Sequence, residues 1–129
     1  MEIPLRAALL AWLAADPVLA AQLNAVTEEA PSRTALPWLA VAASASADWS
    51  AKDMTGREVR IALELHCRGD QPGAAADLVA AIEARIAALP SVQAGLRVVT
   101  VTFLRARAEM RSANTRAVLL EYRFRVLAN

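Results

Sequence analysis

The histidine and the cysteine of this chain, His66 and Cys67, are the residues whose chemistry would best support catalysis or metal binding. A thiol activated by an imidazole is a common enzymatic nucleophile. The two residues are adjacent in a segment whose side chains alternate between apolar and polar, which is typical of a strand. Neighbouring strand residues point to opposite faces of a sheet, so the two side chains cannot form a dyad with each other. We predict that Cys67 is a small core residue and that His66 lies on a solvated face.

Other candidate sites are weaker. One histidine and one cysteine are too few ligands for a zinc site, and a single cysteine excludes an internal disulfide. Residues 53–56 resemble the Asp-Thr-Gly motif of aspartic proteases, but Met54 interrupts the turn that would place the carboxylate. Glu28 and Glu29 are not oriented for acid/base work, and four isolated glycines form no phosphate-binding loop. We therefore predict no catalytic residue, no metal and no cofactor, with a small cysteine-dependent enzyme as the remaining alternative.

The length and composition indicate a small intracellular protein with apolar surface available to a partner. A chain of 129 residues is expected to form a single domain over residues 1–129. It is 57% hydrophobic, and because much of this excess is alanine, we expect some apolar surface to face a partner. Aromatic residues make up only 5%, which argues against a stacking platform for nucleic acid. The longest apolar stretch is interrupted by Asp16 and Pro17, so we predict no membrane span. The single cysteine fits a reducing compartment such as the cytoplasm.

The elements that must position these residues follow from the hydrophobic periodicity. Helical spacing is found at residues 3–15, 17–23 and 72–89, the second capped by Asp16 and the third stopped by Pro90. Strands are predicted at residues 38–44, 57–67, 99–110 and 118–126, with a brief additional strand considered at residues 25–27. The apolar parity shifts between Phe103 and Leu104, which predicts a bulge. After that shift Ala106, Ala108 and Met110 are expected to face inward.

The predicted fold class is α+β, in the order α-α-β-β-α-β-β. An antiparallel four-stranded sheet should be covered on one face by the helices. Residues 45–55 are polar and small apart from Trp49, so we expect a long exposed loop that is mobile in the free subunit.

The charges are distributed unevenly along the chain. Residues 1–96 contain seven Lys or Arg against eleven Asp or Glu, net −4, whereas residues 97–129 contain seven against two, net +5. These charges can form cross-strand pairs on a solvated sheet face. They can also form a head-to-tail contact between identical subunits, in which Arg105 and Arg107 would meet an acidic patch. A nucleic-acid groove is a third interpretation, which the interspersed Glu109 and Glu121 disfavour.

Several short motifs occur in an order that resembles a known family. They are Asp48-Trp49-Ser50-Ala51-Lys52-Asp53, Gly56 and Glu58, Ala88-Leu89-Pro90, Gly95-Leu96-Arg97-Val98-Val99 and Tyr122-Arg123-Phe124-Arg125. Their order and spacing are similar to the tail-completion or tail-terminator family of long-tailed phages, prophages and gene transfer agents. The similarity extends over nearly the whole chain.

This resemblance implies a structural virion protein. A homo-oligomeric ring, typically a hexamer, would cap the tail tube protein and join it to a head-completion or stopper protein, while DNA passes through the lumen without being read. The subunit would be cytoplasmic during assembly and then part of the virion or gene transfer agent particle. The interface residues expected are Asp48, Trp49, Lys52, Asp53, Arg105 and Arg107, with Trp49 either an anchor in a partner or part of the subunit's own core. Another neck or minor tail component is the alternative.

Overall fold

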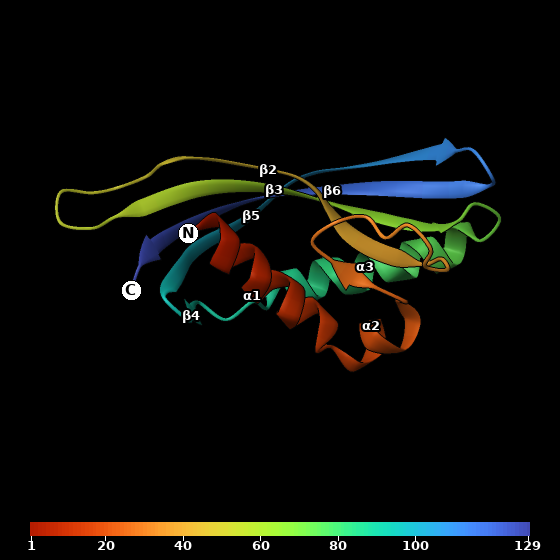
Figure 1. Cartoon of the computed structure of the whole chain (residues 1–129), viewed down its shortest axis with the longest axis horizontal. Coiled ribbons are helices and arrows are strands. Elements are labelled where there is room, and N and C mark those ends of the chain that lie inside the picture. Colours follow the sequence, from red (N-terminus) through yellow and green to blue (C-terminus); the bar gives the residue numbers. More distant parts are fainter.

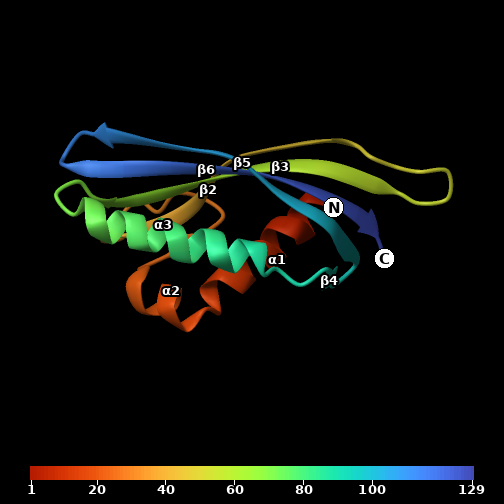
Figure 2. The same cartoon turned by 180° about the vertical axis from the view of Figure 1, so that it is seen from behind.

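The structure, a computed structural model, describes residues 1–129 and consists of a long twisted sheet with three helices on one face (Figure 1). The opposite face of the sheet carries no helix in either view (Figure 2). The helices are α1 (Glu2–Ala14), α2 (Pro17–Gln22) and α3 (Pro72–Ala87). The strands are β1 (Val26–Thr27), β2 (Trp38–Asp48), β3 (Gly56–Arg68), β4 (Val92–Gln93), β5 (Leu96–Arg111) and β6 (Thr115–Ala128).

The helices form where the periodicity predicted them and bury their apolar stripes against the sheet. Leu5, Leu9 and Leu13 of α1 and Ile82 and Ile86 of α3 are all at most 1% exposed. The helix α2 begins as expected, because the Asp16 carboxylate accepts the Leu19 amide at 3.1 Å and Pro17 occupies the first turn. The hydrophobic core therefore lies between one helical layer and one sheet face.

The helices α1 and α3 are joined by a reciprocal contact between Trp12 and Arg85. The Trp12 indole N–H donates to the Arg85 carbonyl at 2.7 Å, and the Arg85 Nε donates to the Trp12 carbonyl at 2.8 Å. The Arg85 guanidinium also lies 3.3 Å from the centroid of the indole ring. Trp12 therefore belongs to the helical layer of the subunit itself.

The sheet has six strands in the order β1-β2-β3-β6-β5-β4, so the prediction of four strands is wrong in number. The two additional strands, β1 and β4, are two residues each and extend the edges of the predicted four. The strand β1 lies at the position considered for a brief strand, but it runs parallel to β2, so the sheet is not purely antiparallel. Strands this short carry no periodicity, and only their pairing defines them.

The strand β2 is longer than predicted, so the expected loop over residues 45–55 is wrong for residues 45–48, whereas residues 49–55 do connect β2 to β3. Its pairing with β3 shifts register between Val41 and Ala43 and then continues to Asp48 opposite Arg57. Ser44 and Ser46 occupy the helix-facing positions of this extension, where Ser44 accepts from Arg6 at 3.1 Å and Ser46 donates to Glu2 of α1. These hydrogen bonds replace the apolar contacts that normally reveal a strand in the sequence.

The predicted bulge in β5 is confirmed, since the register with β6 shifts between Phe103 and Arg105. A second shift in β5, between Val98 and Thr100, was not predicted. Ala106 and Ala108 pair with the buried Leu120 and Val118 of β6, and Met110 has the same parity, so all three share the helix-facing side, as predicted. All three are nevertheless exposed, because the helices do not cover this half of β5.

Candidate interaction surface

The helix-free face of the sheet, which we call the open face, is formed by the four long strands β2, β3, β6 and β5 (Figure 2). Cross-strand partners point to the same face, so the register identifies its members. The central part is strongly charged, and arginines outnumber glutamates six to four. The open-face residues are Trp38, Ala40, Ala43, Ala45 and Ala47 of β2; Glu58, Arg60, Ala62, Glu64 and His66 of β3; Ala117, Leu119, Glu121, Arg123 and Arg125 of β6; and Thr100, Thr102, Arg105, Arg107, Glu109 and Arg111 of β5.

Many of these charges form cross-strand ion pairs. Arg105 contacts both carboxylate oxygens of Glu121 at 3.0 Å, and this pairing holds the pKa of Glu121 below its ordinary value. Glu58 lies 3.3 Å from the Arg123 guanidinium and 3.5 Å from that of Arg125. The interpretation of the charges as cross-strand pairs on a sheet face is therefore confirmed for these residues.

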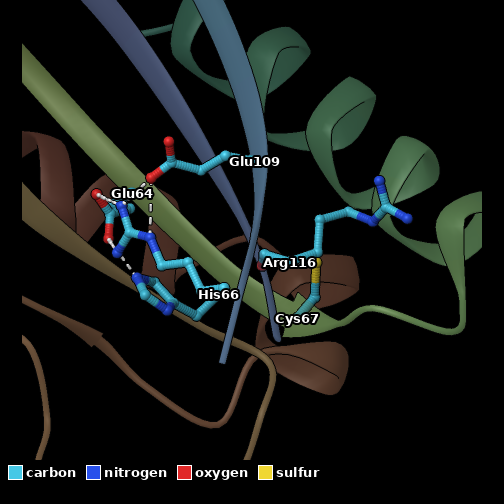
Figure 3. Close-up of polar contacts among 6 residues, drawn as sticks. Glu64, His66, Cys67, Glu109 and Arg116 are labelled. Carbon is cyan, nitrogen blue, oxygen red and sulfur yellow. Dashed lines mark hydrogen bonds and ion pairs between the residues drawn. The ribbon is translucent and has the colours of Figure 1, made fainter. Parts of the chain in front are cut away.

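A larger cluster joins strands β3 and β5 around Glu64 (Figure 3). Arg111 of β5 donates to Glu64 at 2.8 Å and to Glu109 at 2.7 Å, and Glu64 also contacts the His66 ring. Burial raises the pKa of Glu64, but the hydrogen bonds from His66 and Arg111 outweigh it and leave that pKa below its ordinary value. Sequence reasoning missed this cluster because Glu64 and Arg111 are 47 residues apart and only strand pairing brings them together.

The structure places His66 and Cys67 on opposite faces, as predicted. Cys67 is 5% exposed, and its thiol faces the Arg116 carbonyl at 3.6 Å. Burial raises the pKa of the Cys67 thiol, which disfavours the reactive thiolate. The prediction of a solvated His66 is wrong, because its ring stacks on Trp38 with centroids 4.0 Å apart.

No group of three or more His, Cys, Asp or Glu side chains is arranged to hold a metal ion. The helices also lack the combination of length and apolarity that crossing a membrane requires.

The interface residues predicted from the sequence lie in two separate places. Asp48, Trp49, Lys52 and Asp53 form the tip of the β2–β3 hairpin, which projects from one end of the sheet (Figure 1). Arg105 and Arg107 lie in the half of β5 away from this tip, after the register shift between Phe103 and Arg105. These two groups therefore do not form one patch within a subunit.

The hairpin tip is organised by hydrogen bonds. Trp49 donates its amide to the Gly56 carbonyl at 3.0 Å, and the Ser50 hydroxyl donates to Asp48 at 2.7 Å while accepting the Gly56 amide at 3.0 Å. The Trp49 ring is half-buried, and the Arg125 guanidinium lies 5.6 Å from its centroid. The tip thus presents a positioned aromatic side chain between exposed charged residues.

The profile of the family described as Tail completion protein gp17 matches residues 7–127 of the chain. The chain belongs to the tail completion protein family. The match spans the helical layer and nearly the whole sheet, so the order of motifs in the sequence pointed to the correct family. Membership indicates a structural virion protein.

The fold of this tail completion protein is also similar to a solved structure. A chain in the structure titled "Virion of native gene transfer agent (GTA) particle" aligns with a TM-score of 0.79 and 25% sequence identity. The alignment covers 96% of this chain and 95% of that chain. No curated protein sequence matches the chain.

Proposed function

We propose that this tail completion protein is a tail terminator of a phage-like or gene transfer agent particle. Identical subunits form a ring, most simply a hexamer, that caps the tail tube and joins it to a head-completion or stopper protein. The observation that carries the proposal is the similarity to a gene transfer agent virion chain over 96% of this chain and 95% of that one. A match over nearly the full length of both chains favours the same structural role in both.

The distribution of charge supports a ring of identical subunits. A closed ring needs a heterologous contact, in which two different and complementary patches of one molecule meet. The net charge is −4 in residues 1–96 and +5 in residues 97–129, and oppositely charged groups such as Glu29 and Arg107 form no ion pair within the subunit. The arginines of the open face are interspersed with glutamates, so DNA can pass through such a ring without sequence-specific binding.

The hairpin tip is suited to contact a second component. It extends beyond the helical layer and carries Trp49 beside Asp48, Lys52 and Asp53 (Figure 1). Half-buried aromatic residues surrounded by charged groups are common anchors of interfaces. We assign this tip to the contact with the tail tube or with the adjacent subunit.

Native mass spectrometry and sedimentation at high protein concentration, with and without the tail tube protein, test the proposal. We expect a discrete ring that binds tube ends, with the free subunit monomeric at low concentration. A strictly monomeric protein under both conditions, without binding to the tube, would overturn the proposal. A ring that binds other neck proteins but leaves the tube uncapped would assign the chain to a different neck component.

A further inference from the structure

Both long edges of the sheet are unpaired over most of their length. The strand β1 covers β2 only at Leu39 and Ala40, which leaves residues 41–48 of β2 without a partner on that side. At the opposite side, β4 pairs with β5 only at Leu96 and Arg97, which leaves residues 99–111 without a partner. Proteins normally protect such edges, because free backbone groups invite another strand.

The edge of β2 has little protection of this kind. Residues 41–47 contain no proline, no lysine and no charged side chain, only valine, alanine and serine. Leu39 donates its amide to Ala25 beside β1, and Trp49 donates its amide to Gly56. Backbone groups alternate in direction along an antiparallel strand, and a register shift between Val41 and Ala43 moves this alternation by one residue in β2. The Trp49 N–H points to β3, so counting back from it places the N–H and C=O of Ser44 and Ser46 on the free side.

We propose that the free edge of β2 in one subunit pairs with the free edge of β5 in the next subunit, so that the sheet continues from copy to copy. This inference rests on the ring proposed above and identifies the surfaces that build it. The strands β2, β3, β6 and β5 alternate in direction, so a neighbouring β2 placed beside β5 by a cyclic operation runs antiparallel to it. The helices of both copies then lie on the same side of the continuous sheet.

This arrangement covers the apolar strip of β5 that the subunit leaves exposed. Phe103 is 49% exposed and Met110 is 53% exposed on the helix-facing side of β5. The helix α1 is attached beneath β2 through Arg6 and Ser44, so a neighbouring β2 brings its own α1 under this strip. Ile3, three residues before Arg6 on the same flank of α1, is 73% exposed and supplies an apolar contact.

The two edges are also complementary in charge and shape. Glu29 follows β1 and Asp48 ends β2, and neither forms an ion pair within the subunit, whereas Glu28 and Arg105 are already paired with Arg6 and Glu121. Arg107 forms no ion pair within the subunit, so its charge is available to a neighbour. The small open-face residues beside the β2 edge leave a hollow of about 210 Å³ that can receive a long side chain; its lining includes Ala43, Ala45, Arg60, Ala62 and Glu121.

Substitution of Ser46 tests the strand pairing directly. Ser46→Pro removes an N–H that points to the free edge, whereas Ser46→Ala loses the same hydroxyl contact with Glu2 but keeps the N–H. We expect Ser46→Pro to raise the ring dissociation concentration by about tenfold or more relative to Ser46→Ala, because one interstrand hydrogen bond is lost and a carbonyl is left unpaired. Equal thermal unfolding of the two monomers verifies that both are folded.

Disulfide trapping provides a second measurement that does not depend on proline. In a Cys67→Ala background, Ala45→Cys is combined with one cysteine at position 100, 102, 105 or 107 on the open face of β5. Facing open-face residues of paired strands are close enough for a disulfide. We expect one of these cysteine pairs to give a series of disulfide-linked oligomers on oxidation, the largest having as many subunits as the ring. We expect no such series when the second cysteine is Ala84→Cys on α3.

The outcomes separate this inference from the proposed function. If the Ser46→Pro protein forms rings as well as the wild type does, and no cysteine pair gives a disulfide between subunits, the edge pairing is overturned. The terminator role would remain intact. Absence of wild-type rings even with the tube protein present would overturn the terminator role itself, and the edge pairing with it.

Discussion

Substitution of Trp49 can distinguish a contribution to the stability of the subunit from a contribution to the assembled interface. Its ring has one cation–π neighbour, Arg125, and is only half-buried. We therefore expect Trp49→Ala to cost the isolated subunit about 1 kcal/mol or less but the assembled interface about 2 kcal/mol or more. Thermal unfolding of the subunit and the lengths of tails assembled with it measure the two effects, and Trp49→Phe is the conservative control. Normal tails with Trp49→Ala would refute the anchor role, and a large loss of subunit stability would assign Trp49 to the subunit's own core.

Gly56 is required by close packing at the base of the same hairpin. A Cβ atom at this position would lie 2.6 Å from the Trp49 carbonyl oxygen and 3.0 Å from the Val126 carbonyl oxygen. Because both neighbours are backbone atoms, we expect Gly56→Ala to lower the free energy of unfolding by about 1–3 kcal/mol. Gly73→Ala is a matched control in α3, where nothing lies within 4 Å and alanine should be neutral or stabilising. Denaturant unfolding compares them, and equal midpoints would contradict the steric argument.

Cys67 should behave as a core residue in solution. Because burial raises the pKa of its thiol, we expect iodoacetamide to label Cys67 slowly in the native protein and completely after unfolding. Native labelling at the rate of the unfolded chain would indicate an accessible thiolate and would revive the alternative of a cysteine-dependent enzyme.

At the scale of elements, the cluster around Glu64 connects strands β3 and β5 on the open face. The pKa of Glu64 is lower in the folded state than in the unfolded chain, so its ionised form stabilises the fold. This contribution is complete above the ordinary glutamate pKa and is lost as the pH falls through the lowered folded-state value. We expect Glu64→Gln to destabilise the protein near pH 7, with the difference from wild type shrinking as the pH falls below about 4.5.

Unfolding measured from pH 7 to pH 3 tests this expectation. Glu29→Gln is a suitable control, because Glu29 is exposed and forms no ion pair in the subunit. A difference between wild type and Glu64→Gln that does not change with pH would show that the ionised form of Glu64 makes no contribution.

At the scale of the whole molecule, Arg105 and Arg107 differ in their availability to a neighbouring subunit, although the sequence analysis assigned both to the same contact. Arg105 is paired with Glu121 within the subunit, whereas Arg107 forms no ion pair. We expect Arg107→Glu to weaken ring formation without unfolding the monomer, and the Arg105/Arg107 double reversal to weaken it further. Higher salt should also weaken the wild-type ring, because exposed charges are screened.

Sedimentation at two salt concentrations measures these effects, with Arg68→Glu as the control, because Arg68 is exposed at the end of the central strand β3 and lies at neither sheet edge. Ring formation unaffected by the double reversal would show that both arginines are only solvated.

Local patterns in the sequence determined the parts of this protein that depend on one element at a time. Helical spacing and prolines located α1, α2 and α3, and alternation along β3 placed His66 and Cys67 on opposite faces. The order of short motifs also led to the correct family. These features are readable because each element must bury one face, whatever it packs against.

Pairing between distant segments determined the features that the sequence did not reveal, namely the extent of β2 and the surfaces that the helices leave exposed. Ser44 and Ser46 belong to β2 because α1 offers them hydrogen-bonding partners, and no apolar pattern records such partners. Met110 has the parity of a core residue but is exposed, since the helical layer does not reach the far half of β5. Sequence periodicity states which side of an element is apolar, whereas only the tertiary structure determines what covers that side and which strand edges remain free.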